Sequence, residues 1–241
     1  MTWSSSVQGS VAARLPRLSR AAGSTSWSSR KQTVYHDRVR GEWLAPWGVV
    51  EVLRLGLDEV LLGAGGGYGT QIIPYDETLP PEAAATFTIQ LDQLLPNVAG
   101  SLNVGHLQSC EALNQAAVRA GATVKRGVGG VVLDPGPRPQ VSYELDGREH
   151  RVRCRLVVGA DGRSSSIRHQ ASVELRETVP RIMGAGLLIE GLREWPEHLE
   201  AIGTEGETHF LIFPRPGGFA RLYIMWDIAQ RTRFSGAEGT T

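Results

Sequence analysis

The stretch LVVGADGRSSSIR, residues 156–168, decides the fold that this sequence predicts. Its first part, Leu156–Val158, is apolar without alternation, which is typical of a buried strand in a parallel sheet. Gly159 and Gly162 let the backbone turn and approach a ligand where a Cβ would clash. Asp161 follows the strand directly, where a carboxylate can bind ribose hydroxyls or the water around a pyrophosphate. The stretch therefore predicts a nucleotide-binding corner.

Short Gly-Asp motifs are common, and an ordinary strand–turn–helix with a polar corner is the alternative. The stretch resembles the second nucleotide motif, with its Asp-Gly core, of the FAD-dependent aromatic hydroxylases. These are single-component flavoprotein monooxygenases of the para-hydroxybenzoate hydroxylase type. In that family the segment touches FAD and also serves NADPH. The resemblance assigns Gly159, Asp161 and Gly162 to cofactor binding.

Composition is that of a globular protein. Apolar residues make up 41% of the 241 residues, and 25 Lys and Arg balance 25 Asp and Glu. The balanced charge gives no sign of nucleic-acid binding, and no apolar run is long enough to span a membrane. Cys110 and Cys154 follow no metal or redox spacing, so we expect two small buried residues in a reducing compartment, by default the cytoplasm.

A second match to the family lies around residues 32–57. The pattern over 49–57 predicts an amphipathic helix that Gly56 ends. Relatives carry an acid for the adenosine ribose at the end of the second strand, but Arg30 stands at that place. Arg40 matches the family arginine that lies against the FAD pyrophosphate, where a guanidinium can form two parallel hydrogen bonds. A solvated loop is the alternative for this arginine.

The third match is a helix expected within residues 105–121 and ended by Gly121. His106 falls where relatives carry a glutamine or arginine that contacts FAD. We include this histidine as a cofactor-binding candidate. A hydrogen-bonding role at the start of the helix is the alternative, because a lone histidine is not specific evidence for a ligand.

Residues 1–31 depart from the family. They are rich in serine, arginine and alanine, contain no acid, and suit a transit peptide or a disordered arm. Serine codons of the TCN type, read two bases late, become NTC, which always encodes Phe, Leu, Ile or Val. The shifted frame makes residues 3–6 and 24–29 apolar strands and permits a G-x-G-x-x-G loop over 6–13. We therefore hypothesise a frame-shifted first βα unit, with the frame restored near residues 30–31.

The resemblance implies an α/β fold. Its parts are a Rossmann-like FAD-binding domain of the glutathione-reductase type over residues 32–175, with a substrate-side insertion around 63–100, and an antiparallel-sheet substrate domain over 176–241. Within the insertion, the alternation over 86–91 predicts a half-buried strand. Relatives continue with a Gly-Asp motif for the ribityl and pyrophosphate portion of FAD. We therefore expect an incomplete fold, truncated at the C-terminus.

For function, the resemblance implies an FAD-binding oxidoreductase that takes electrons from NADPH or NADH. It would hydroxylate or epoxidise a small organic substrate through a flavin C4a-hydroperoxide. The flavin carries this chemistry, so we expect no metal, and the sequence indicates no catalytic residue. A flavin-dependent reductase of the geranylgeranyl reductase type shares the scaffold and is one alternative. A non-catalytic fragment is another, which leaves enzyme activity open.

Overall fold

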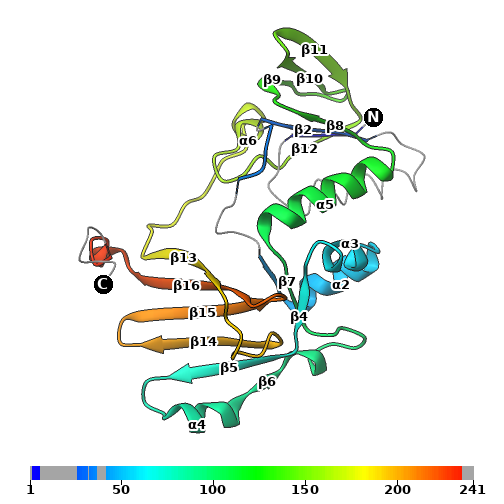
Figure 1. The fold of residues 1–241 in the computed structure, drawn as a ribbon. Helices are drawn as coiled ribbons and strands as arrows, with labels where there is room; N and C mark the ends of the chain where they lie inside the picture. The colour runs from blue at the N-terminus through cyan, green and yellow to red at the C-terminus, as the bar shows by residue number, and fades with distance from the viewer. Residues whose placement is uncertain (1, 6–25, 32, 37–41, 235–241) are drawn as a thin grey trace. The chain divides into compact units, whose positions relative to one another are not determined.

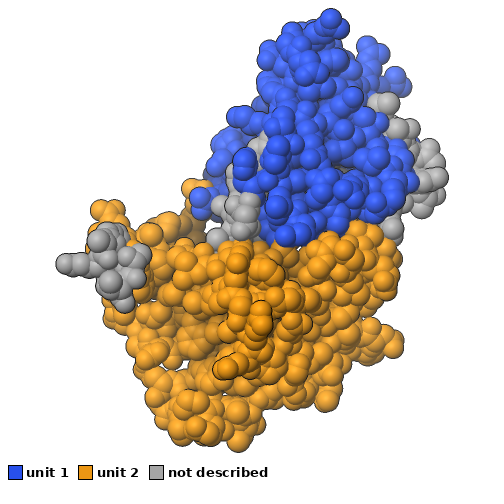
Figure 2. Space-filling view, in the orientation of Figure 1, with its two compact units in different colours: residues 1–38, 106–176 blue, residues 39–105, 177–241 orange. Residues whose placement is uncertain are grey.

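The computed structural model describes residues 2–5, 26–31, 33–36 and 42–234. The chain forms two compact units (Figures 1 and 2). Unit 1 contains residues 1–38 and 106–176, and unit 2 contains residues 39–105 and 177–241. Each unit takes segments from two separate parts of the chain. The predicted division into a cofactor domain and a substrate domain remains a prediction.

Unit 1 contains a parallel sheet of four strands, in the order β12-β1-β2-β8. The strands are β1 (Thr2–Ser5), β2 (Ser26–Arg30), β8 (Thr123–Arg126) and β12 (Leu156–Gly159). Every adjacent pair runs parallel, with Trp3 opposite both Trp27 and Val157. The carboxyl ends of all four strands therefore lie along one edge of the sheet.

Strand β2 is buried along its whole length, although three of its five residues are serines. Ser26, Ser28 and Ser29 are 5%, 7% and 2% exposed. Inner strands of parallel sheets are normally continuous runs of Val, Ile and Leu. Polar composition and buried position therefore conflict in β2. The frame-shift hypothesis would remove this conflict, and it remains a prediction.

Helix α5 (His106–Arg119) and a three-stranded antiparallel sheet complete unit 1. The helix packs against β8 and buries one face that includes Cys110, and it ends at Gly121, whose φ is +89°. The sheet has the order β11-β10-β9, with strands β9 (Gly129–Asp134), β10 (Gln140–Leu145) and β11 (Arg148–Arg153). Helix α5 appears where the sequence predicts it, and the prediction of two buried cysteines is confirmed.

A six-stranded mixed sheet dominates unit 2, in the order β13-β16-β15-β14-β5-β6. Its strands are β5 (Gln71–Asp76), β6 (Ile89–Gln90), β13 (Ile182–Glu190), β14 (Leu199–Glu205), β15 (Thr208–Arg215) and β16 (Phe219–Asp227). Only β14 and β5 pair in parallel; the other neighbours are antiparallel. The predicted α/β class with an antiparallel sheet is confirmed.

A smaller antiparallel sheet lies beside short helices in the same unit. Its order is β3-β7-β4, with β3 (Trp43–Leu44), β4 (Gly67–Gly69) and β7 (Ser101–Asn103). These helices are α2 (Pro46–Arg54), α3 (Asp58–Leu62) and α4 (Pro81–Ala84), whereas α6 (Ser166–Gln170) belongs to unit 1. The helix predicted over 49–57 is α2. It begins earlier, because a proline is tolerated at the first helical position.

Two predictions are wrong in part. The run Leu156–Val158 forms a parallel strand, but β12 is the edge of its sheet and Leu156 is 54% exposed. The alternation over 86–91 does not give a full strand. Only β6 pairs there, and 3₁₀ turns flank it. Thr86 and Thr88 donate their hydroxyls to nearby main-chain carbonyls at 2.7 and 2.6 Å, which closes local turns in place of a ladder.

No helix in the described part of the chain is both long and apolar enough to cross a lipid bilayer.

Candidate nucleotide-binding site

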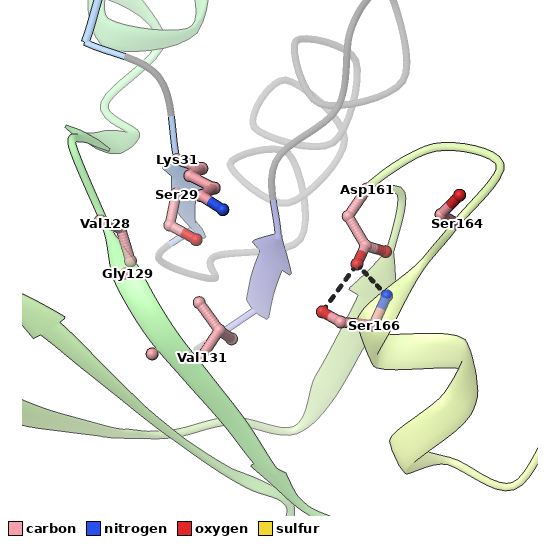
Figure 3. Close-up of a pocket in the computed structure, with 9 residues that line it drawn as sticks. Ser29, Lys31, Val128, Gly129, Val131, Asp161, Ser164 and Ser166 are labelled. Carbon is pink, nitrogen blue, oxygen red and sulfur yellow. Dashed lines mark hydrogen bonds between the residues drawn. The ribbon is translucent and has the colours of Figure 1, made fainter.

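A pocket of about 380 Å³ opens in unit 1 at the carboxyl ends of β2 and β12 (Figure 3). Its lining residues are Ser29, Lys31, Val128, Gly129, Gly130, Val131, Asp161, Ser164 and Ser166. The crevice outside the carboxyl ends of parallel strands is where α/β sheets bind ligands. The topology of the sheet therefore places the pocket where a nucleotide would be expected.

Asp161 is held in place by the start of α6. One carboxylate oxygen accepts from the Ser165 hydroxyl, and the other accepts from the Ser166 and Ile167 main-chain amides at 2.6 and 3.2 Å. The Ser166 hydroxyl also donates to it, at 3.0 Å (Figure 3). Burial on its own would raise the pKa of Asp161, but these hydrogen bonds outweigh burial and lower it. The carboxylate thus shapes the corner as well as lining the pocket.

The two glycines beside Asp161 are required for different reasons. Gly162 has a φ of +92°, a left-handed conformation that side chains rarely adopt. A Cβ on Gly159 would lie 2.6 Å from Cγ2 of Ile167, which is buried under the corner. Both therefore have structural roles at the corner, and neither is among the residues that line the pocket.

Replacing Asp161 by asparagine is expected to lower the free energy of unfolding by about 1 kcal/mol at neutral pH, since an amide cannot accept all four hydrogen bonds. A lowered pKa in the folded state stabilises the protein above the unfolded-state pKa, and this stabilisation is lost as the pH falls through the folded-state pKa. The difference from wild type should therefore vanish in acid. Urea unfolding across pH measures it, with Asp134→Asn, an exposed residue of the same unit, as the control.

The opposite side of the pocket carries a cation and a hydroxyl. Ser29 is at the end of β2, and Lys31 follows it with an exposed side chain (Figure 3). Gly129 has open space where a Cβ would be, so the wall at the start of β9 is bare. An ammonium, several hydroxyls and a wall without side chains suit the sugar and phosphate of a nucleotide. The described residues therefore fit such a group.

Arg30, which stands at the place of the expected acid, does not line the pocket. Its guanidinium carbon lies 3.6 Å from the centre of the Tyr35 ring, and Arg126 lies 5.1 Å from the same ring. Burial raises the pKa of Tyr35, while Arg30 and Arg126 oppose that rise. Because successive residues of a strand point to opposite faces, Ser29 faces the pocket and Arg30 faces this ring.

The predicted site residues are only partly brought together. Asp161 lines the pocket, with Gly159 and Gly162 beside it. His106 is buried at the start of α5, with its ring nitrogens 3.7 and 3.8 Å from the Cys110 sulfur. Arg40 lies outside the described residues. The contacts of all five candidates with a cofactor remain predictions.

Sequence reasoning missed most of the pocket lining, namely Ser29, Lys31, 128–131, Ser164 and Ser166. The order of the strands could have indicated these residues. Residues that follow neighbouring parallel strands meet at one edge of the sheet, and the end of β2 was such a place. The polar sequence of residues 24–29 concealed the strand.

Several solved structures share the fold. A flavoprotein/dehydrogenase from Cytophaga hutchinsonii superposes with a TM-score of 0.81 at 14% identity, over 98% of this chain and 57% of that one. The flavin-dependent halogenase CmlS gives 0.78 at 16%, over 99% and 44%. The p-nitrophenol 4-monooxygenase PnpA from Pseudomonas putida DLL-E4 gives 0.76 at 10%, over 96% and 60%. The chain thus spans about half the length of these proteins.

A search of curated protein sequences found no match. The model of one protein family, described as FAD binding domain, matches residues 84–239. This match covers more than half of the chain and includes the Asp161 corner together with β13 to β16. The chain therefore belongs to the FAD binding domain family, as the resemblance of its Asp-Gly motif predicts.

Proposed function

We propose that the pocket of unit 1 binds the sugar–phosphate part of FAD, and that the chain contributes this site to an NAD(P)H-dependent flavin monooxygenase acting on a small organic substrate. The observation that carries the proposal is the position of the pocket. It lies at the carboxyl ends of parallel strands, in a chain of the FAD binding domain family. PnpA, which shares the fold, is itself named as a monooxygenase.

Each residue of the pocket would contact a different part of the cofactor or hold the residues that do. The Lys31 ammonium would pair with a phosphate, and the hydroxyls of Ser29 and Ser166 would bind phosphate or ribose oxygens. Asp161 would hold the corner that presents Ser164 and Ser166. When bound, FAD would supply the redox chemistry, and the protein would orient it and exclude water.

Replacing Lys31 by alanine is expected to weaken FAD binding about tenfold, because a charge-assisted contact with a phosphate is lost from an exposed side chain that does not stabilise the fold. Quenching of flavin fluorescence during titration with the purified chain measures the dissociation constant. Lys125→Ala is the matched control, since it removes the same charge from an exposed position of β8, outside the pocket. If FAD binding weakens equally in both variants, the effect comes from the change in net charge, and the proposed contact between Lys31 and a phosphate is contradicted.

The wider activity has its own test. If the protein incorporates oxygen from labelled O₂ into an organic product when NADPH or NADH is supplied, monooxygenase activity is supported. Turnover without oxygen would favour a reductase of the geranylgeranyl reductase type. A chain that takes up no FAD at all would contradict the proposed cofactor site and favour a non-catalytic fragment.

A further inference from the structure

Unit 2 buries two carboxyl groups in different surroundings. Glu42 is 1% exposed and forms ion pairs with Arg221 and Arg215. Glu200, in β14, is completely buried, and no ion pair reaches it from the described residues. Its partners are neutral donors: the Ser101 hydroxyl, the Asn103 amide at 2.7 Å, and the Trp43 indole nitrogen at 3.0 and 3.1 Å.

The hydrogen bonds of Ser101 indicate whether the Glu200 carboxyl is protonated. Its hydroxyl oxygen contacts both Oε1 of Glu200 and the carbonyl oxygen of Gly69, which lies at 3.3 Å. An ionised carboxylate and a carbonyl can only accept, and one hydroxyl has one proton. If Glu200 is protonated, it donates to Ser101, and Ser101 donates to Gly69. Both contacts are then satisfied.

We infer that Glu200 carries its proton in the folded protein, donates it to the Ser101 hydroxyl, and positions the indole of Trp43 through its acceptor oxygen. The function of this residue is to hold Trp43 within the aromatic cluster of unit 2, defined as Trp43, Trp47, Phe213 and Tyr223. Glu200 is thus a positioning residue for the Trp43 ring.

The cluster is organised by Trp43. The Trp43 and Phe213 rings stack at 5.2 Å with an interplanar angle of 18°, and Trp47 meets Trp43 edge-on at 6.4 Å. Tyr223 in turn packs against Phe213 at 5.8 Å. Because the indole N–H of Trp43 donates to Glu200 alone among the described residues, the orientation of this ring depends on that acceptor.

Among the described residues, no charged side chain hydrogen-bonds to Glu200. Trp43 comes from β3, Ser101 and Asn103 from β7, and Gly69 from β4. A Cβ on Gly69 would overlap both Glu200 and Ser101, which explains one residue of the glycine-rich run 63–69. Burial raises the pKa of Glu200 above its ordinary value of 4.5; the hydrogen bonds from Ser101, Asn103 and Trp43 oppose this rise without cancelling it.

The pH dependence of stability follows from the difference between the folded-state and the unfolded-state pKa of Glu200. Between the unfolded-state and the folded-state pKa of Glu200, the folded chain binds more of this proton than the unfolded chain. The stabilisation is therefore complete below the unfolded-state pKa and is lost as the pH rises through the folded-state pKa. Over this window, the unfolding equilibrium constant of wild type should rise with pH relative to that of Glu200→Gln, by at most tenfold per unit, because the amide does not titrate.

Glu200→Gln preserves the shape of the network. The new amide group can donate to Ser101, and Asn103 can rotate so that its Oδ1 accepts; this oxygen is buried and has no hydrogen-bond partner in the structure. Glu200→Ala removes the acceptor of Trp43 altogether. Glu205→Gln, at the exposed end of the same strand, is the matched control.

Urea unfolding of the full chain between pH 5 and pH 9 tests the proton, and infrared spectroscopy tests it independently. We expect a protonated-carboxyl band in wild type and in Glu205→Gln that is absent from Glu200→Gln and that disappears as the pH is raised. In chains labelled with 5-fluorotryptophan, the ¹⁹F signal assigned through Trp43→Phe should keep its position in Glu200→Gln and move in Glu200→Ala. The inference is overturned if the ratio of the unfolding equilibrium constants of wild type and Glu200→Gln does not change with pH, or if Glu200→Gln keeps the infrared band of wild type. The glutamine variant decides the question even if the alanine variant does not fold.

Discussion

Replacement of Glu42 by alanine is expected to cost about 3–5 kcal/mol of unfolding free energy. Glu42 accepts from the Nε and NH2 groups of Arg221, and Arg221 is 3% exposed. Arg215 approaches the same carboxylate at 3.4 Å. Removing the carboxylate takes a hydrogen-bonded counter-charge from two largely buried guanidinium groups, and the loss of that charge dominates the cost. Urea unfolding monitored by circular dichroism measures the loss.

Glu51→Ala provides the comparison. Glu51 pairs with Arg54 one turn along α2, with side chains 42% and 59% exposed, and such exposed pairs contribute at most about 0.5 kcal/mol. The two variants remove the same group from the same unit and differ in burial. A loss of less than about 1 kcal/mol in Glu42→Ala would show that the buried pair does not hold unit 2 together.

Restoring the alternative frame between residues 3 and 29 of the coding sequence is expected to tighten FAD binding at least tenfold, about 1.4 kcal/mol. The restored segment would supply a glycine loop, whose main-chain amides can cradle a pyrophosphate at the start of a helix. It would also replace Ser26, Ser28 and Ser29, which are buried in β2, with larger apolar residues, and each buried methylene adds about 0.8 kcal/mol. The expected gain in affinity is net of the Ser29 hydroxyl, which the pocket would lose. Flavin titration and thermal unfolding measure the two gains.

The control is a glycine-to-alanine change within the restored loop, which should remove the gain in affinity and keep the gain in stability. The hypothesis is wrong if the coding DNA does not encode apolar strands in that frame, or if the restored chain binds FAD no better than the present one. Because Lys31 belongs to both chains, its contribution to binding can be judged separately from the frame.

Local patterns in the sequence predicted much of the fold. Asp146 and Gly147 both have positive φ, 52° and 71°, as a tight hairpin between β10 and β11 requires. The same holds for the helix that ends at Gly121 and for the Asp-Gly corner, where Gly162 adopts its left-handed conformation. Turns and helix ends depend on a few neighbouring residues, so their signals survive in the sequence without tertiary information.

Pairings between distant segments could not be predicted in this way. Strand β14 joins β5 in parallel, so Glu200 lies opposite Ile72, and no local pattern indicates this pairing. The burial of Glu200 depends on it. Likewise, the exposure of Leu156 follows from the place of β12 at the sheet edge, which the apolar run itself does not reveal.

The sequence by itself determined the family, the hairpins, the helices α2 and α5, and the Asp161 corner, because each depends on residue types at short spacing. Only the tertiary structure decided which charges are buried and what faces them. Glu42 and Glu200 are the same residue type, yet one meets Arg221 and the other meets a hydroxyl, an amide and an indole. The energy of a buried carboxyl depends on partners that the fold brings from 97 to 179 residues away, and a local pattern carries no information about them.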